Sequence, residues 1–79
     1  MNLEGRTVIV TGGASGLGGA TVDMVVSAGG RAVIVDVNDQ AGKAAAERLG
    51  DKVRFVKADV TSDVDMQHAV DVAKKNFGG

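Results

Sequence analysis

The sequence predicts an α/β fold in which a parallel sheet lies between layers of helices. Three short runs rich in β-branched residues alternate with three segments in which apolar residues recur at spacings of three and four. The first two runs are apolar along almost their whole length, as are strands that are covered on both faces. Strands that alternate with helices form right-handed parallel crossovers, so we expect the element order β-α-β-α-β-α and the strand order 3-2-1.

The three predicted strands are short and differ in their pattern. They are Thr7–Thr11, Ala32–Asp36 and Val53–Lys57. The third strand alternates apolar and polar residues more regularly than the other two, which is typical of a strand at the edge of a sheet. This arrangement is one mononucleotide-binding half of a Rossmann-type three-layer fold, and residues 1–79 are expected to form part of a single domain.

A predicted helix follows each strand. We expect the first to end at Gly29, because glycine adopts the left-handed cap conformation without strain. The second is expected to begin at Asn38 or Asp39 and to stop at Gly50, and the third to have Ser62 as its N-cap. The apolar stripes expected to face the sheet are Leu17, Ala20, Met24, Val25 and Ala28, then Ala41, Ala44, Ala45 and Leu49, and then Met66, Ala69, Val70, Ala73 and Phe77.

The composition limits the class of protein. With two aromatic residues in 79, the core must consist of Val, Ile, Leu, Ala and Met, and we expect Met24 and Met66 to fill gaps in it. The lack of cysteine excludes a disulfide framework, and a net charge of −1 with interspersed charges predicts no nucleic-acid partner. Neither a membrane span nor a signal peptide is recognisable, so we expect a cytoplasmic protein.

The segment between the first strand and the first helix has the sequence TGGASGLGG. Gly12 allows a sharp turn out of the strand, Gly16 allows close approach of a pyrophosphate, and Gly18 allows the helix to pack tightly on the sheet. The free amides at the helix N-terminus attract a phosphate, and Ser15 offers a hydroxyl donor. Leu17 belongs to the same loop and is counted among the cofactor-binding residues. We therefore predict binding of a phosphate-bearing cofactor here.

Glycines in such a loop also have a purely structural interpretation, in which they only permit tight turns and close packing. The sequence context favours cofactor binding, because a strand precedes the loop, a helix follows it, and an acid ends the second strand. No Lys-Ser or Lys-Thr pair follows the glycines, so the loop is not the P-loop of nucleoside triphosphatases.

Asp36 ends the second predicted strand, where the adenosine ribose lies in a Rossmann unit. A carboxylate here accepts hydrogen bonds from ribose hydroxyls and repels a 2′-phosphate. The two positions suited to a basic residue that would bind this phosphate hold Ser15 and Val37. We therefore expect NAD rather than NADP. The alternative is a solvated turn acid beside Asn38 and Asp39.

Asp59 and Val60 follow the third predicted strand in the segment ADVTS. The Asp59 carboxylate is placed to accept a hydrogen bond from the adenine amino group, and the Val60 backbone to pair with the ring. A turn acid at the end of a strand explains Asp59 equally well from spacing alone.

These three pieces, taken in order, resemble the N-terminal part of a short-chain dehydrogenase/reductase. The fingerprint T-G-x-x-x-G-x-G of that family is matched from Thr11 to Gly18, and its adenine-contacting Asp-Val pair by Asp59 and Val60. Within the family, the segments VTGGASGLG, ADVTS and AKKNFG are most similar to the type 2 short-chain 3-hydroxyacyl-CoA dehydrogenases. The resemblance implies an NAD-dependent oxidoreductase acting on a hydroxyl or ketone group and a full fold of seven strands.

The same resemblance implies that catalysis needs residues this sequence lacks. Family enzymes are about three times as long and supply a catalytic Ser and a Tyr-x-x-x-Lys pair after a fourth strand. This sequence contains no tyrosine, so we expect a truncated, inactive chain with no catalytic residue. An alternative is a stand-alone or engineered nucleotide-binding module, and another is a structural piece without ligand. Without a fourth strand, the bare edge of Thr7–Thr11 is expected to self-associate.

The remaining polar residues predict no further site. His68 is the only histidine and lies in a helical segment without a second ligand at metal-binding spacing. Asp63, Asp65 and Asp71 are expected to stabilise a helix N-terminus or to lie on a solvated face. We therefore expect no metal.

Overall fold

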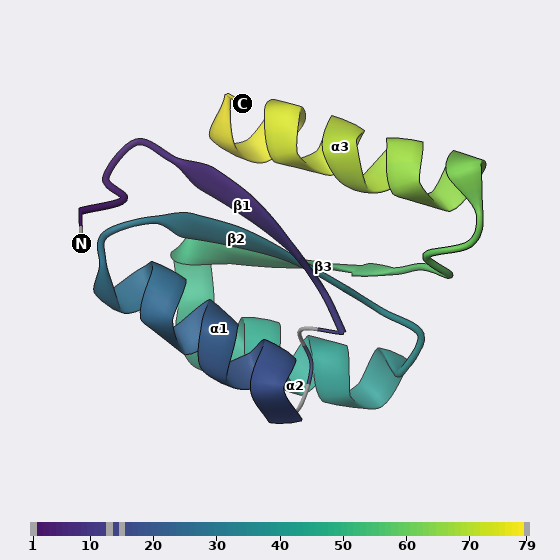
Figure 1. Ribbon diagram of the computed structural model, residues 1–79, viewed down its shortest axis with the longest axis horizontal. Helices are drawn as coiled ribbons and strands as arrows, with labels where there is room; N and C mark the ends of the chain where they lie inside the picture. Colours follow the sequence, from purple (N-terminus) through teal and green to yellow (C-terminus); the bar gives the residue numbers. More distant parts are fainter. Residues whose placement is uncertain (1, 13, 15, 79) are drawn as a thin grey trace.

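The structure, a computed structural model, describes residues 2–12, 14 and 16–78 (Figure 1). The elements in chain order are β1 (Thr7–Thr11), α1 (Gly16–Ser27), β2 (Arg31–Asp36), α2 (Asp39–Leu49), a 3-10 turn (Gly50–Lys52), β3 (Val53–Lys57) and α3 (Asp63–Phe77). The predicted order β-α-β-α-β-α is confirmed, and the predicted strand bounds differ by one residue at the start of β2.

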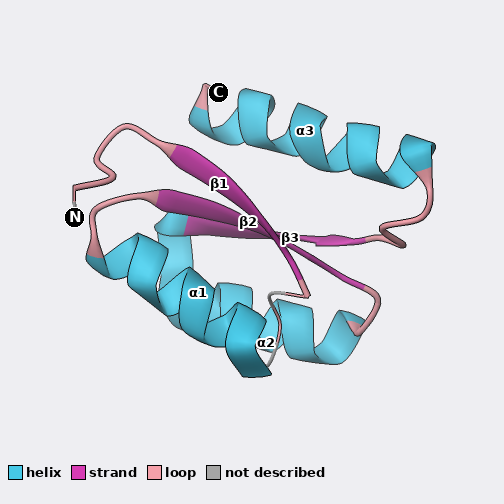
Figure 2. Cartoon of the chain, in the orientation of Figure 1, coloured by secondary structure: helices cyan, strands magenta, loops and turns pink. Residues whose placement is uncertain are grey.

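The three strands form one parallel sheet in the order β1-β2-β3, which is the predicted 3-2-1 arrangement. β2 is the central strand: Ile34 pairs with Val10 of β1 on one side and with Phe55 of β3 on the other. The helices α1 and α2 cover one face of the sheet and α3 covers the opposite face (Figure 2). The side chains of the central strand therefore pack against helices on both faces of the sheet.

Burial of β2 explains its continuous apolar run. Ala32 and Ile34 pack in one core cluster with Val22 and Val25 of α1. The alternate residues of β2, Val33 among them, pack in a second cluster on the α3 side. Since successive side chains of a strand point to opposite faces, a strand covered on both faces has no position for a polar residue between its two ends, Arg31 and Asp36.

The helices α2 and α3 begin where capping side chains stand. The Asn38 side chain accepts a hydrogen bond from the backbone N–H of Ala41 at 3.0 Å, which decides between the two predicted starts of α2. The Ser62 hydroxyl accepts from the N–H of Asp65 at 3.2 Å, as predicted for α3. Gly78 then ends α3 in the left-handed conformation.

The predicted apolar stripe of α1 is wrong for three of its five residues. Leu17 and Met24 are 86% and 51% exposed, and Ala20 is also exposed, whereas Val22 and Val25 are the buried residues of this helix. The helix is apolar around most of its circumference, so spacings of three and four fit two faces. Met24 is therefore not a core residue, whereas Met66 packs against the second core cluster as expected.

Packing on the sheet selects the buried face of α1, and a glycine selects that of α2. Asp23 of α1 lies 3.1 Å from Arg48 of α2, which leaves Leu17 and Met24 on the side of α1 that faces away from α2. In α2 the predicted stripe fails at Ala44, which is exposed, because α2 approaches the sheet through the buried Gly42. A Cβ atom on that glycine would overlap the ring of Phe55.

Candidate functional site

The candidate site lies at the carboxyl ends of the strands. Because the three strands are parallel and in register, the segments that follow them leave the sheet at one edge. The glycine loop follows β1, Asp36 ends β2, and the turn containing Asp59 and Val60 follows β3. The fold therefore places all three predicted pieces of the site along this edge.

The glycine loop leaves β1 through residues that require glycine. Gly12 and Gly16 have φ angles of +66° and +59°, a region that residues with a Cβ atom rarely adopt. Among the described residues, no atom lies within 4 Å of a Cβ built on either glycine, so conformation rather than crowding demands glycine here. The N–H of Gly12 donates to the carbonyl oxygen of Val35 at 2.7 Å, which attaches the start of the loop to β2.

The Asp36 carboxylate is turned toward this loop. Its Oδ2 accepts a hydrogen bond from the N–H of Ala14 at 3.2 Å, and its Oδ1 accepts from the N–H of Asn38 at 2.9 Å. The side chain is half-buried, so part of the carboxylate remains open to solvent. The structure thus brings Asp36 and the loop together. Ala14 has no signal in the sequence, because it contributes only a backbone group.

The first turn of α1 offers backbone amides rather than charged side chains. It begins at Gly16, followed by Leu17 and Gly18, and contains no acidic residue. The first amides of a helix have no acceptor within the helix, and the aligned peptide dipoles make this end positive. Gly18 lies one turn before the buried Val22 on the same face, and its packing role stays a prediction. Ser15, the predicted hydroxyl donor, lies outside the described residues.

Asp59 forms a turn at the end of β3. Its Oδ1 accepts hydrogen bonds from the hydroxyl of Thr61 at 2.7 Å and from the N–H of Thr61 at 2.8 Å. These two bonds lower the pKa of Asp59, the hydroxyl bond more than the backbone bond. The N–H of Asp59 donates to Asp65 Oδ2 at 3.0 Å, a contact that sequence reasoning missed. Val60 is 55% exposed. The structure therefore contains the turn that was one of the two interpretations of Asp59. The contact of Asp59 with adenine stays a prediction.

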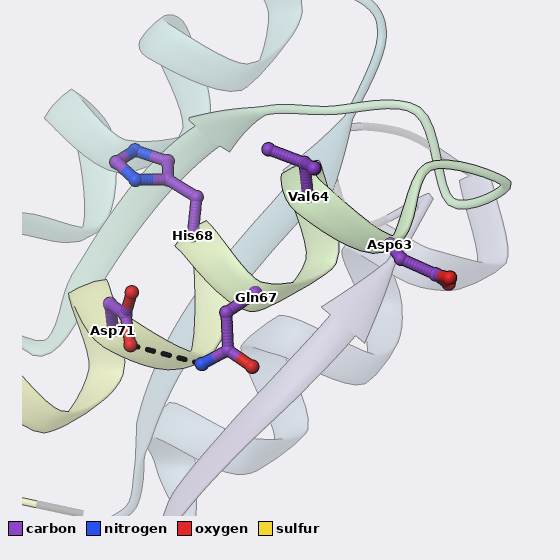
Figure 3. Close-up of a pocket in the computed structure, with 5 residues that line it drawn as sticks. All are labelled: Asp63, Val64, Gln67, His68 and Asp71. Atoms are coloured by element: carbon purple, nitrogen blue, oxygen red, sulfur yellow. Dashed lines mark hydrogen bonds between the residues drawn. The ribbon is translucent and has the colours of Figure 1, made fainter.

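A shallow hollow on α3 contains three of the other polar candidates, Asp63, His68 and Asp71 (Figure 3). Its lining residues all belong to α3 and are all exposed, and within it Gln67 Nε2 donates to Asp71 Oδ1 at 3.1 Å. In the described part of the chain, no three His, Cys, Asp or Glu side chains are grouped to hold a metal ion. The residues that line the hollow are Asp63, Val64, Gln67, His68 and Asp71. They form a solvated face of α3, which lies on the opposite side of the sheet from α1 (Figure 2).

A parallel sheet with a glycine-rich turn after its first strand and an acid at the end of its second defines a Rossmann-type nucleotide-binding unit. The chain belongs to the short-chain dehydrogenase family, whose sequence pattern matches residues 6–79.

Matches to named proteins extend over almost the whole chain. It is 47% identical over 77 residues to the sex determination protein tasselseed-2 of Zea mays, a match that covers 98% of this chain and 23% of that protein. It is 44% identical over 77 residues to the 3-hydroxyacyl-CoA dehydrogenase type-2 of Homo sapiens, covering 98% of this chain and 30% of the human protein. The chain thus spans less than a third of the length of these relatives.

The fold agrees closely with a solved structure of the family. A 3-ketoacyl-(acyl-carrier-protein) reductase from Brucella melitensis, complexed with NADH, superposes with a TM-score of 0.92 at 32% identity. The superposition covers 98% of this chain and 32% of the reductase. Within residues 2–12, 14 and 16–78, no helix has the length and apolar character needed to span a membrane.

Proposed function

We propose that this chain binds NAD(H), with the diphosphate at the N-terminus of α1 and the adenosine ribose at Asp36. The observation that carries the proposal is the orientation of the Asp36 carboxylate, which lies 3.2 Å from the Ala14 amide of the glycine loop. A ribose and the diphosphate attached to it need a carboxylate and free amides side by side. The NADH complex of the related reductase supports the same ligand class.

The remaining predicted contacts follow from this placement. Gly12 and Gly16 hold the loop in shape, Gly18 seats α1 on the sheet, and Ser15 and Leu17 flank the diphosphate. Asp59 and Val60 are proposed to contact the adenine. Asp59 has one carboxylate oxygen, Oδ2, to which no hydrogen bond is assigned within the described residues, and this oxygen is the proposed acceptor for the adenine amino group.

The choice of NAD over NADP rests on charge. A 2′-phosphate would lie against the Asp36 carboxylate, and neither Ser15 nor Val37 supplies a compensating cation. Calorimetric titration with NAD, NADP and AMP tests both the ligand class and this choice. We expect NAD to bind at least tenfold more tightly than NADP, which corresponds to about 1.4 kcal/mol. Tighter binding of NADP would show that Asp36 has been given the wrong role.

We further propose that the chain is the cofactor-binding part of an oxidoreductase that acts on a hydroxyl or ketone group. NAD(H) supplies hydride transfer in such an enzyme, and this chain's residues bind and orient it. The human relative suggests 3-hydroxyacyl-CoA as the substrate class to test first. Because the sequence contains no tyrosine to act as proton donor, we expect no turnover of this chain with NAD and 3-hydroxybutyryl-CoA. Turnover would contradict this part of the proposal.

A stand-alone nucleotide-binding module is the second candidate function. The glycine loop, Asp36 and the turn after β3 all lie within 79 residues, and the chain has two core clusters of its own. The coding sequence and the intact mass of the natural product distinguish the two candidates. A Tyr-x-x-x-Lys segment in the same product supports the enzyme. A product of 79 residues that binds NAD supports the module. The lack of cysteine suits the reducing cytoplasm, which is our proposed location.

We also propose that two copies of this chain associate through β1. The outer edge of β1 has no pairing strand among the described residues and carries no charge, whereas β3, at the other edge, carries Arg54 and Lys57. α1 packs over β1 and β2, so its exposed Leu17 and Met24, which face away from α2, lie toward the uncharged edge.

A two-fold axis parallel to the strands would join two such edges into a six-stranded parallel sheet. Sedimentation velocity at increasing concentration tests this arrangement, and we expect a dimer that Thr7→Lys weakens, since Thr7 begins β1 and belongs to neither core cluster. Lys is a residue that natural proteins place on edge strands to prevent pairing. A monomer at the highest concentration would contradict the proposal.

A further inference from the structure

Asp36 connects three segments of the molecule that lie apart in the sequence. Its Oδ2 receives the Ala14 N–H of the glycine loop, and its Oδ1 receives the Asn38 N–H at the start of α2. The backbone of β2 makes one further attachment, since the Val35 carbonyl receives the Gly12 N–H. Two of the described amides of the glycine loop are therefore held by the last two residues of β2.

These attachments matter because the loop is rich in glycine. Glycine loses more conformational freedom on folding than any other residue, and the loop and the first turn of α1 contain five glycines between residues 12 and 19. An anion site made of backbone amides binds well only when its amides are already oriented before the ligand arrives. A fixed acceptor for the Ala14 amide supplies part of that orientation.

Positioning the loop and binding a ribose are compatible tasks for one carboxylate. Its two oxygens have about four lone-pair sites. The amides of Ala14 and Asn38 occupy two of them, which leaves two for the hydroxyls of a ribose. The half-buried Asp36 side chain leaves these sites accessible from solvent.

We propose that Asp36 is a positioning residue for the glycine loop: through the Ala14 amide it holds the loop in the shape that binds a diphosphate. The consequence is that diphosphate affinity depends on Asp36 even for a nucleotide that offers it no ribose hydroxyl. The inference rests on the proposed function for its ligand, whereas the attachment of the loop can be measured without any ligand.

The experiment compares ADP with 2′,3′-dideoxy-ADP, which lacks both ribose hydroxyls. Asp36→Ala is expected to bind dideoxy-ADP about tenfold more weakly than the wild-type chain, because the loop has lost a charged acceptor. Loss of a negative charge beside an anion acts in the opposite direction, so weaker binding cannot come from electrostatics. Equal or tighter binding of dideoxy-ADP by Asp36→Ala, with ADP weakened, would mean that Asp36 acts only on the ribose and would overturn the inference.

Asp39→Asn is the matched control, because it removes a carboxylate at the same end of the sheet. Asp39 pairs with Lys43 at 3.0 Å, and no contact to the glycine loop is assigned to it. We expect this variant to bind dideoxy-ADP as tightly as the wild-type chain or more tightly. A loss equal to that of Asp36→Ala would overturn the inference, since the effect would then not belong to the loop attachment.

Amide hydrogen exchange in the free chain gives the second measurement. In Asp36→Ala the Ala14 amide is expected to exchange about tenfold faster, while the Ile34 amide in the centre of β2 keeps its protection and reports that the fold is intact. Unchanged exchange at Ala14 would overturn the inference. If the wild-type chain binds neither ADP nor dideoxy-ADP, the proposed function fails, and this measurement alone decides whether Asp36 holds the loop.

Discussion

The first turns of the three helices differ in charge. α2 and α3 start at side-chain caps, Asn38 and Ser62, and both have acidic residues in the first turn. The first turn of α1 contains no acidic residue and follows the glycine loop. Acids near a helix N-terminus satisfy its positive end from within the chain. We expect this difference to matter for ligand binding, because the first turns of α2 and α3 carry negative charge of their own, whereas that of α1, the proposed diphosphate site, carries none.

The largest expected effect comes from changing the shape of the loop before α1. Gly16→Val places a β-branched residue at a φ of +59°, which costs about 2 kcal/mol or more and moves the first amides of α1. We expect NAD affinity to fall by about 100-fold in calorimetry. Gly50→Val is the control, since Gly50 has a φ of +71° at the end of α2, away from the site. It should lower stability similarly and leave NAD affinity unchanged. Equal losses of affinity would contradict the proposed site.

Giving α1 an acid of its own should make it resemble the other two helices. Leu17 is 86% exposed in the first turn, so Leu17→Asp disturbs no core contact. We expect the aspartate to stabilise the helix by about 0.3–1 kcal/mol and to weaken NAD binding about tenfold through repulsion of the diphosphate. Leu17→Asn has the same shape without the charge and should lose much less affinity. Affinity equal in the two variants would show that the first turn does not face an anion.

Removing a cap from α3 should affect stability alone. Ser62→Ala deletes the acceptor of the Asp65 amide and is expected to lower the free energy of unfolding by about 1 kcal/mol. Chemical denaturation measures this change, and Ser62→Thr, which keeps a hydroxyl, is the control. We expect NAD affinity to change less than twofold after correction for the folded fraction. A large loss of affinity in the folded chain would mean that the α3 cap also belongs to the site.

Sequence reasoning succeeded where side-chain chemistry alone decides the structure. The all-apolar run before Asp36 specifies a central strand, and Asn38 and Ser62 specify helix starts, because few residue types satisfy these positions. It failed for Leu17 and Met24, because α1 is apolar on two faces and only its packing on β1 and β2 selects one.

The contacts that shape the candidate site could be predicted only in part. Asp36 was identified because a carboxylate at the end of that strand has a recognisable role in nucleotide binding. Its hydrogen bond to Ala14 was missed, since any residue except proline offers the same backbone donor. The two interpretations of Asp59 stayed open because a turn and an adenine contact demand the same residue at the same place. The structure shows its turn and leaves one oxygen for the other role.

The smallest expected effect concerns the pKa of Asp59. It tests whether the Thr61 hydroxyl bonds to Asp59 in solution as it does in the structure. The Thr61 hydroxyl is the main cause of the lowered pKa of Asp59, so Thr61→Val should raise this pKa toward its ordinary value of 3.8. Thr61→Ser, which keeps the hydroxyl, should leave it low. A pH titration of the Asp59 carboxyl followed by NMR measures both variants.

The sign of the linked stability follows from the direction of this shift. Because the pKa is lower in the folded chain, the charged Asp59 stabilises the fold above pH 3.8, and this contribution is lost as the pH falls below 3.8 through the folded pKa. Asp59 is fully exposed, so the effect on unfolding should be small and further reduced by salt. An unchanged pKa in Thr61→Val would show that the hydroxyl bond between Thr61 and Asp59 does not persist in solution.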